Sequence, residues 1–266
     1  MGDPTKNADR NARTVGARHG YGRLRGAGRS IVRSAVAVLY LVCLVCLGTR
    51  PGAAEPPNPT TIVVFGDSQA AGLASGLQRV LVENQRYRVL NRTHTGAALV
   101  NGEREWLEPI SRFLSREKAD VAVVMVGAND RLDLRDDQGG SLRFRTDEWR
   151  KVYAARADKI LTTLAKAGLK VIWCGNPIAR SENYSADMTY LNDIFAGEAA
   201  RSDALFVSLW DVVADDQGHY TAYGKDRHGT TQRLRADDGN HFTVAGYEVI
   251  AEKIVGLLSA TGGNAR

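Results

Sequence analysis

Strand-like apolar segments alternate with helix-like segments along most of the chain, and this alternation is the feature that most limits the fold. The apolar segments cover residues 61–66, 87–91, 120–127, 169–175 and 204–210. Four of the five are nearly continuous apolar runs, as strands are when helices cover both faces of a parallel sheet. The helix-like segments cover residues 70–84, 103–117, 146–168, 188–202 and 243–260. This order predicts an α/β fold, a three-layer α/β/α sandwich around a mostly parallel five-stranded sheet.

The first 54 residues differ from the rest of the chain in charge. Of the 35 Lys and Arg residues nine lie there, against two of the 30 acidic residues, which leaves 26 basic and 28 acidic residues in the remainder. The positive net charge of the chain therefore belongs to this leader. Because phosphate binding needs basic residues gathered on the folded surface, the sequence predicts no nucleic-acid partner.

The order of residue types within the leader is that of a secretory signal. An Arg-rich stretch precedes the apolar run 35–48, and small residues follow before Glu55. We predict cleavage after Ala54. The alternative is an uncleaved anchor, although the apolar run is shorter than the roughly 18 to 20 residues of a spanning helix. On either interpretation we expect an exported protein, periplasmic or anchored to the inner membrane facing the periplasm.

The chain therefore divides into a signal peptide or N-terminal signal-anchor over residues 1–54, a short tether over 55–60 and one domain over 61–266. The last part is long enough to bury a single sizeable core. It contains one of the three cysteines, Cys174, which has no partner for an internal disulfide. Because free cysteine is among the most buried residue types, we predict that Cys174 is a buried hydrophobic residue rather than a nucleophile.

Asp67 and Ser68 stand at the point where the first apolar segment ends. One interpretation is that either side chain caps the following helix, an arrangement that stabilises a fold by about 1 kcal/mol. The other is that the turn presents Ser68 as a nucleophile. A serine nucleophile needs an imidazole to accept its proton, a carboxylate to orient that imidazole, and hydrogen-bond donors for the oxyanion.

Candidates for these other roles stand at strand ends and in loops. Asp238 and His241 are three residues apart in a turn, so the carboxylate can meet Nδ1 and leave Nε2 for Ser68. Gly96 can bring a backbone N–H close to a substrate, and Asn129 can donate through its side-chain amide. The sequence therefore predicts the triad Ser68, Asp238 and His241. It predicts Gly96 and Asn129 as oxyanion or substrate-binding residues, although each residue alone could also serve only a turn or a cap.

The sequence motifs around these residues resemble, in residue type and in order, the signature blocks of the SGNH (GDSL-type) hydrolase superfamily. Those blocks are Gly-Asp-Ser, an isolated Gly, Gly-x-Asn-Asp and Asp-x-x-His. The residues that match its four naming positions are Ser68, Gly96, Asn129 and His241. Asp238 matches the triad acid. The longer stretches FGDSQAAGLASGL, VGANDR, GNPIAR and LRADDGNHFTVAGY resemble an exported bacterial subfamily described as a domain of unknown function.

The resemblance extends from Thr61 to nearly the end of the chain. It implies a flavodoxin-like fold, no metal or other cofactor, and ester hydrolysis through an acyl-enzyme on Ser68. It also implies that the N–H groups of Ser68 and Gly96 and the amide of Asn129 hold the oxyanion. One departure is Gln69, which stands where the GDSL form has Leu, at a position outside the chemistry.

Two polar segments that contain glycine, 131–145 and 212–235, are long for connections in an α/β domain. Both follow strands, and ligands of open α/β sheets bind outside the carboxyl ends of the strands. We predict that these segments form walls of the site rather than solvated surface loops. His94, His219 and His228 remain as alternative bases or as substrate contacts.

The sequence thus predicts an exported serine esterase that removes a short acyl group, such as acetyl, from a carbohydrate or cell-envelope substrate. Transfer of the acyl group to another hydroxyl would use the same residues. The expected partner is an acylated small molecule or glycan. We expect contact with a membrane only if the leader stays uncleaved and anchors the protein. The sequence leaves the oligomeric state open. The alternative is a non-catalytic glycan-binding module of the same fold, against which the complete triad argues. A phosphate or nucleotide binder is disfavoured because the first loop lacks a Gly-rich cradle.

Overall fold

The structure of the protein is a computed structural model that describes residues 58–136 and 138–262. The signal or signal-anchor predicted over 1–54 lies outside the described residues, as do residues 55–57, the first half of the tether predicted over 55–60. Among the helices of the described part, none combines the length and the apolar character that a bilayer crossing requires.

The central sheet has five parallel strands in the order β2-β1-β3-β6-β7. The strands are β1 Thr60–Gly66, β2 Tyr87–Asn91, β3 Val121–Met125, β6 Lys170–Cys174 and β7 Leu205–Val207. The three inner strands are almost wholly buried, whereas the edge strands β2 and β7 are partly exposed. This burial explains why the inner strands are continuous apolar runs, and the strand order confirms the predicted flavodoxin-like sheet.

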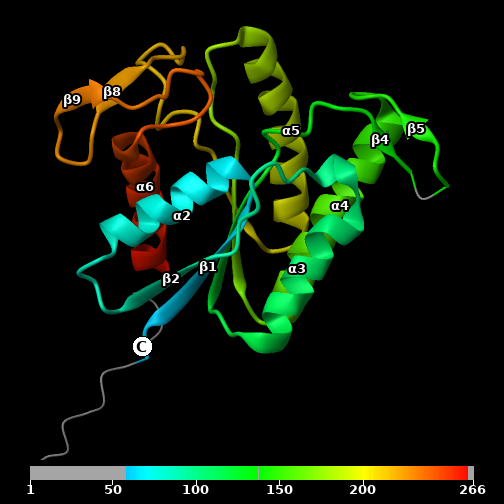
Figure 1. Ribbon diagram of the computed structural model, residues 1–266, viewed down its shortest axis with the longest axis horizontal. Helices are drawn as coiled ribbons and strands as arrows, with labels where there is room; N and C mark the ends of the chain where they lie inside the picture. Colours follow the sequence, from blue (N-terminus) through cyan, green and yellow to red (C-terminus); the bar gives the residue numbers. More distant parts are fainter. Residues whose placement is uncertain (1–57, 137, 263–266) are drawn as a thin grey trace, which may run out of the picture. The chain divides into compact units, whose positions relative to one another are not determined.

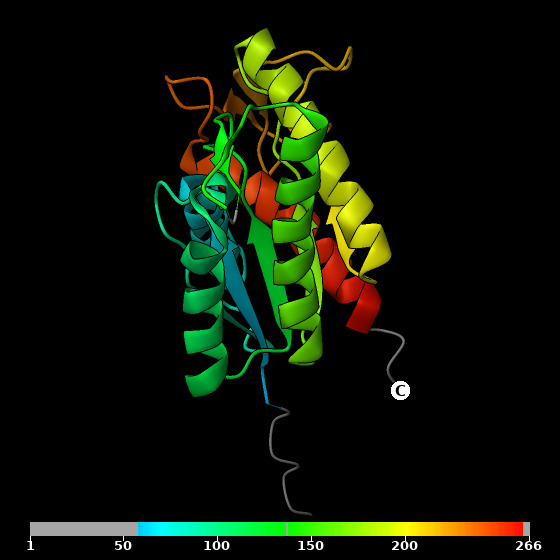
Figure 2. The ribbon, with the colours of Figure 1, turned by 90° about the vertical axis from the view of Figure 1, so that its right-hand side faces the viewer.

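Helices cover both faces of the sheet, which confirms the three layers (Figure 1). The helices α2 and α6 pack together on one face. Figure 2 looks onto the other face, where α3, α4 and α5 lie side by side. The bounds of the helices are α2 Ser68–Val80, α3 Glu103–Arg116, α4 Asp147–Lys166, α5 Glu182–Arg201 and α6 Val244–Gly262, with a short 3-10 helix η1 at Leu99–Asn101.

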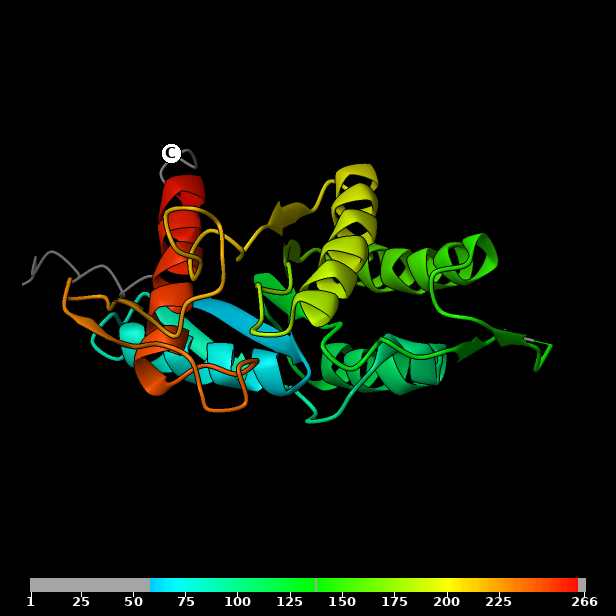
Figure 3. The ribbon, with the colours of Figure 1, turned by 90° about the horizontal axis from the view of Figure 1, so that it is seen from above.

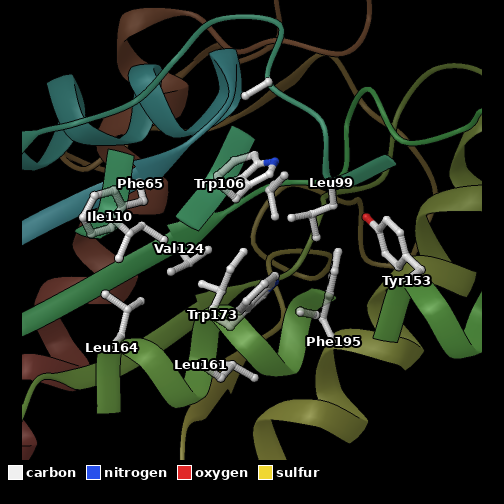
Figure 4. Packing of buried hydrophobic residues seen from close by; sticks show 14 of the residues in the cluster. Phe65, Leu99, Trp106, Ile110, Val124, Tyr153, Leu161, Leu164, Trp173 and Phe195 are labelled. Atoms are coloured by element: carbon white, nitrogen blue, oxygen red, sulfur yellow. The ribbon is translucent and has the colours of Figure 1, made fainter. Parts of the chain in front are cut away.

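Successive residues of β1 point to opposite faces, so the sheet separates two apolar clusters. Val63 and Phe65 belong to the cluster under α3, α4 and α5, part of which Figure 4 shows. Ile62 and Val64 belong to the cluster under α2 and α6. Cys174 is fully buried in the second cluster, and burial raises the pKa of its thiol to about 12. The prediction that Cys174 is a buried hydrophobic residue is thus confirmed.

The two long polar segments each contain a small antiparallel hairpin, which the sequence pattern did not indicate. In the first, β4 (Leu134–Arg135) pairs with β5 (Ser141–Leu142), and in the second, β8 (Tyr223–Lys225) pairs with β9 (Thr231–Arg233). Figures 1 and 3 show the first hairpin beyond α4 and the second beside α6. The hairpins are therefore far from each other, and only segments next to them reach the centre of the site.

Helix ends differ from the predicted bounds where a cap decides them. The helix expected from residue 70, α2, begins instead at Ser68, close to the end of β1, because Asp67 is its N-cap. The helix expected from Met188 begins at Glu182, since the Ser181 side chain accepts the Tyr184 N–H as an N-cap. This earlier start brings the first turn of α5 to the carboxyl edge of the sheet.

Candidate active site

The turn after β1 combines the two interpretations of Asp67 and Ser68. Asp67 is the N-cap of α2, and its Oδ1 accepts the N–H of Gln69 at 2.9 Å while its Oδ2 accepts the N–H of Ala128 at 3.3 Å. Ser68 is the first residue of the helix and is half-buried. Because Asp67 does the capping, the hydroxyl of Ser68 is left for other partners.

Ser68, His241 and Asp238 form a continuous chain of hydrogen bonds. The Ser68 Oγ lies 2.8 Å from His241 Nε2, and His241 Nδ1 lies 2.6 Å from Asp238 Oδ2. These residues come from the start of α2 and from the loop before α6, 173 residues apart in sequence. The arrangement matches the predicted triad in both contacts, and it is the geometry in which an imidazole accepts a serine proton.

The environment of Asp238 keeps its carboxylate ionised. Partial desolvation raises its pKa, but the His241 ring and the backbone N–H groups of Asn240 and His241 outweigh this and lower the pKa to about 2. An ionised carboxylate only accepts, so Nδ1 of His241 carries the proton and Nε2 is free to accept from Ser68.

The side chain of Arg235 holds the loop that carries His241. Its fully buried guanidinium donates through Nη2 to the carbonyl oxygens of Ile178 at 2.6 Å and of Gly239 and Asn240 at 3.2 Å. It also lies 4.0 Å from the ring centroid of Phe242. Three carbonyls held by one nitrogen leave the loop little freedom, so Arg235 positions the loop of His241 without touching Ser68.

Gln69 also holds this loop, although the sequence placed it outside the chemistry. Its Nε2 donates to the carbonyl of Asn240 at 2.8 Å, and its Oε1 accepts the Tyr247 hydroxyl at 3.1 Å. Tyr247 reaches this point because it packs against Gly72, where a Cβ would lie 1.9 Å from the tyrosine ring. Gln69 therefore connects α2, the loop of His241 and α6 by hydrogen bonds that a leucine could not make.

The proposed oxyanion donors follow strands β1, β2 and β3, which are neighbours in the sheet. Asn129 donates one N–H of its amide to the carbonyl of Ala97 at 3.0 Å, and its second N–H remains for another acceptor. The N–H of Ser68 is at the first helical position, where no intrahelical acceptor exists. Gly96 is exposed in the turn between His94 and Ala97, with a φ of 83° that glycine adopts readily.

We expect Asn129→Ala to slow ester turnover by about a hundredfold or more, because removal of one oxyanion donor has that effect in serine hydrolases. Steady-state rates on an activated acetyl ester give the measurement. Asn101→Ala is the matched control, since Asn101 donates from η1 to the exposed Glu105 and has no contact with the triad. An unchanged rate in the Asn129 variant would remove this residue from the mechanism.

Asp130, next to Asn129, connects three segments behind the site. Its Oδ1 accepts the Val100 N–H at 2.8 Å and its Oδ2 accepts the Tyr153 hydroxyl at 2.9 Å. The side chain is fully buried, and burial raises its pKa to about 7 even though both hydrogen bonds act in the opposite direction. Burial likewise raises the pKa of Asp67 to about 6.

The raised pKa values of Asp67 and Asp130 contribute a free energy of unfolding that decreases as the pH rises. In the unfolded chain an aspartate ionises near pH 4, so between about pH 4 and pH 7 the folded state binds more protons than the unfolded state. The free energy of unfolding then decreases with rising pH across this window. We expect the fall in melting temperature from pH 5 to pH 8 to be smaller by about 5 °C in Asp130→Asn than in the wild type. In the exposed Asp193→Asn, the fall should equal that of the wild type; equal slopes in all three proteins would contradict the assignment.

Of the histidines that the structure describes, His241 is the one whose ring contacts Ser68. His94 is exposed and borders a cavity of about 550 Å³ between α3 and the loop after β2. His219 and His228 lie in exposed turns beside Asp215 and Asp226. In the part of the chain that the structure describes, no group of three or more His, Cys, Asp or Glu side chains is arranged to hold a metal ion.

The walls of the site are only partly those predicted. Arg131, in the first polar segment, lines a cavity beside Asp238. The second polar segment instead contributes Tyr220 to the support of the guanidinium groups of Arg180 and Arg235. Ser181 and Tyr184, at the start of α5, also line this cavity, and the sequence analysis did not predict them, although they closely follow the GNPIAR stretch.

Comparison with known sequences identifies a protein family that this chain matches. The family model described as Protein of unknown function (DUF459) matches residues 61–256, most of the chain. A search of curated proteins gave no significant match.

Several solved structures share the fold at low sequence identity. The alpha/beta hydrolase LAE5 from the metagenome of Lake Arreo has a TM-score of 0.54 at 20% identity, over 74% of this chain and 94% of that one. A GDSL-like lipase from Bacteroides thetaiotaomicron has a TM-score of 0.52 at 14% identity, over 76% and 89%. A catalytic mutant of the acetylxylan esterase Axe2 from Geobacillus stearothermophilus has 0.52 at 16%, over 74% and 92%. The predicted likeness to the GDSL-type hydrolases is thereby confirmed for the fold.

Proposed function

The chain belongs to the DUF459 family, and on the geometry of its site we propose that it is a serine esterase. The observation that carries the proposal is the chain of hydrogen bonds from Ser68 through His241 to Asp238, at 2.8 and 2.6 Å. Binding alone gives no reason to assemble these three side chains. The non-catalytic glycan-binding module is therefore the weaker alternative.

In the proposed reaction, Ser68 Oγ attacks the ester carbonyl while its proton moves to His241 Nε2. Asp238 holds the imidazolium that forms, and the N–H groups of Ser68, Gly96 and Asn129 receive the negative charge on the carbonyl oxygen. The alcohol leaves with the proton from His241, and an acyl-enzyme remains on Ser68. Water then attacks the acyl carbon, His241 takes its proton, and the carboxylic acid leaves as Ser68 regains its hydrogen. Attack by a sugar hydroxyl in place of water would give acyl transfer with the same residues.

The proposed substrate is a short acyl ester, such as an acetyl ester, of a carbohydrate or cell-envelope polymer. Polar segments beside the site fit a hydrated substrate better than a long-chain lipid, and the similarity of the fold to an acetylxylan esterase agrees with this. The leader composition supports a place in the periplasm or on the inner membrane facing it, where such polymers occur.

The proposal is tested by turnover of p-nitrophenyl acetate and by acetate release from acetylated glycans. We expect saturable release of p-nitrophenol and labelling of the protein by a serine-reactive fluorophosphonate. Heat-denatured protein is the control for spontaneous hydrolysis. Absence of both turnover and labelling would contradict the esterase and favour the binding module.

A further inference from the structure

A cavity of about 390 Å³ adjoins the candidate triad, and its lining is basic. It is lined by Arg131, Arg180, Ser181, Tyr184, Asp238 and Asn240. We propose that this arginine cavity binds a carboxylate on the alcohol part of the ester, so that the substrate is an O-acylated acidic sugar. The inference rests on the proposed function and names the substrate class of the same site.

The arginine cavity lies between the two loops that carry the proposed chemistry. Asp238 and Asn240, on one side, belong to the loop of His241. On the other side, the hydroxyl of Tyr184 donates to the carbonyl oxygen of Ala128 at 2.9 Å, immediately before the oxyanion asparagine. The cavity therefore adjoins both loops through Asp238, Asn240 and Tyr184, although Ser68 and His241 themselves do not line it.

The direction of proton transfer places the alcohol part of the substrate at this cavity. His241 Nε2 must give its proton to the leaving oxygen, so the alcohol lies along the loop of His241. The carbonyl oxygen points instead toward the N–H groups of Ser68 and Asn129. Since Asp238 and Asn240 line the cavity, it is the alcohol, and not the acyl group, that extends into it.

Arg180 supplies a positive charge without a carboxylate counterion. Its Nη1 donates to the carbonyl oxygen of Asp237 at 2.9 Å, and its guanidinium lies 5.8 Å from the ring centroid of Tyr220. Among the described residues no carboxylate forms an ion pair with it. The remaining N–H groups form the planar donor set that binds a carboxylate through two parallel hydrogen bonds.

Arg131 adds to this charge because two guanidinium groups share one carboxylate. Arg131 Nε lies 2.6 Å from Asp187 Oδ2, and Arg145 Nη1 lies 3.3 Å from Asp187 Oδ1. The other carboxylate at the cavity, Asp238, is hydrogen-bonded to His241. The N-terminal end of α5 also meets the cavity, and its dipole favours an anion. These charges favour a carboxylate over a neutral or cationic group.

The test compares two esters that differ in charge only on the alcohol part, meta-acetoxybenzoate and meta-acetoxybenzamide, in the full-length protein. We expect kcat/KM for the benzoate to exceed that for the amide by about tenfold after correction for their spontaneous rates. In Arg180→Gln this ratio should fall close to one, mainly through KM, and Arg180→Lys should restore part of it. A ratio near one in the wild type, or an unchanged ratio in Arg180→Gln, would overturn the inference.

The matched control for charge is Arg104→Gln. The side chain of Arg104 is 94% exposed on α3 and does not line the cavity, so both rates should equal those of the wild type. If Arg180→Gln and Arg180→Lys lowered both rates equally, Arg180 would only support the loop of His241 through its bond to Asp237, and the carboxylate site would be rejected.

A binding measurement separates this inference from the proposed function. Titration of the wild type with glucuronate and with glucose, followed by calorimetry or NMR, needs no turnover. We expect weak binding of glucuronate, at about millimolar concentration, that Arg180→Gln weakens at least fivefold, and no binding of glucose in this range. Binding without any esterase activity would reject the proposed function and retain the carboxylate site. Esterase activity without selective binding or preference for the benzoate would do the reverse.

Discussion

We expect Ser68→Ala to reduce ester turnover by about a millionfold, because the change removes the hydroxyl that would take the acyl group in the proposed reaction. In the proposed reaction the hydroxyl oxygen attacks the ester carbonyl, and the 2.8 Å contact to His241 is the path of its proton. Rates on p-nitrophenyl acetate and labelling by a fluorophosphonate measure the loss independently. Both signals should disappear together.

The fold should survive this change, since the capping of α2 is the work of Asp67 and not of Ser68. The matched control is Ser75→Ala in the same helix, where the hydroxyl donates to the carbonyl oxygen of Ala71. We expect both variants to melt within a few degrees of the wild type. Persistent turnover in Ser68→Ala, with Ser75→Ala unchanged, would show that another nucleophile is used.

The architecture was predictable because a strand that is buried on both faces has a continuous run of apolar residues in its sequence. The runs around Val63 and Val123 are apolar throughout because neighbouring residues face different clusters, and both clusters consist of buried hydrophobic residues. Edge strands have a less continuous apolar pattern. The edge strand β7 covers only Leu205–Val207 of the expected segment 204–210. The apolar residues that follow in that segment pack as part of a loop, which apolar character alone does not reveal.

The triad was predictable because the carboxyl ends of parallel strands meet at one edge. Ser68 follows β1 and Asn129 follows β3, the strand beside it, so their proximity follows from the strand order. Asp238 and His241 precede α6, which packs on α2, and Gln69 in the first turn of α2 is hydrogen-bonded to Asn240 and Tyr247 near the start of α6. The roles of these residues in catalysis, and the export of the protein, stay predictions.

The support of the site could not be predicted, because it depends on contacts between segments distant in sequence. Arg235 holds the carbonyl of Ile178, and Tyr184 reaches the carbonyl of Ala128, from a helix whose early start was missed. No spacing in the sequence encodes such bonds to backbone oxygen. The supporting role of Gln69 was not foreseen for the same reason, since its partner Asn240 lies 171 residues away.

Asp238→Asn will lower kcat by about ten-thousandfold, although the side chain changes by little more than one charge. The amide can still accept the N–H groups of Asn240 and His241 through Oδ1, so the loop should keep its shape. Its NH₂ group, however, would face His241 Nδ1 and select the tautomer with the proton on Nε2. That nitrogen then donates toward Ser68 and cannot accept its proton.

Asp237→Asn is the matched control, because Asp237 is the neighbouring residue and pairs with Arg233 rather than with the imidazole. Its rate should stay close to that of the wild type. The pH dependence gives a second criterion: since the pKa of Asp238 is lowered to about 2, its protonation cannot explain any loss of wild-type activity above about pH 4. A small deficit in Asp238→Asn, with Ser68→Ala inactive, would mean that His241 is oriented by its backbone and by the loop. In that case Arg235 and Gln69, which hold the carbonyl of Asn240, would be the groups that position the base.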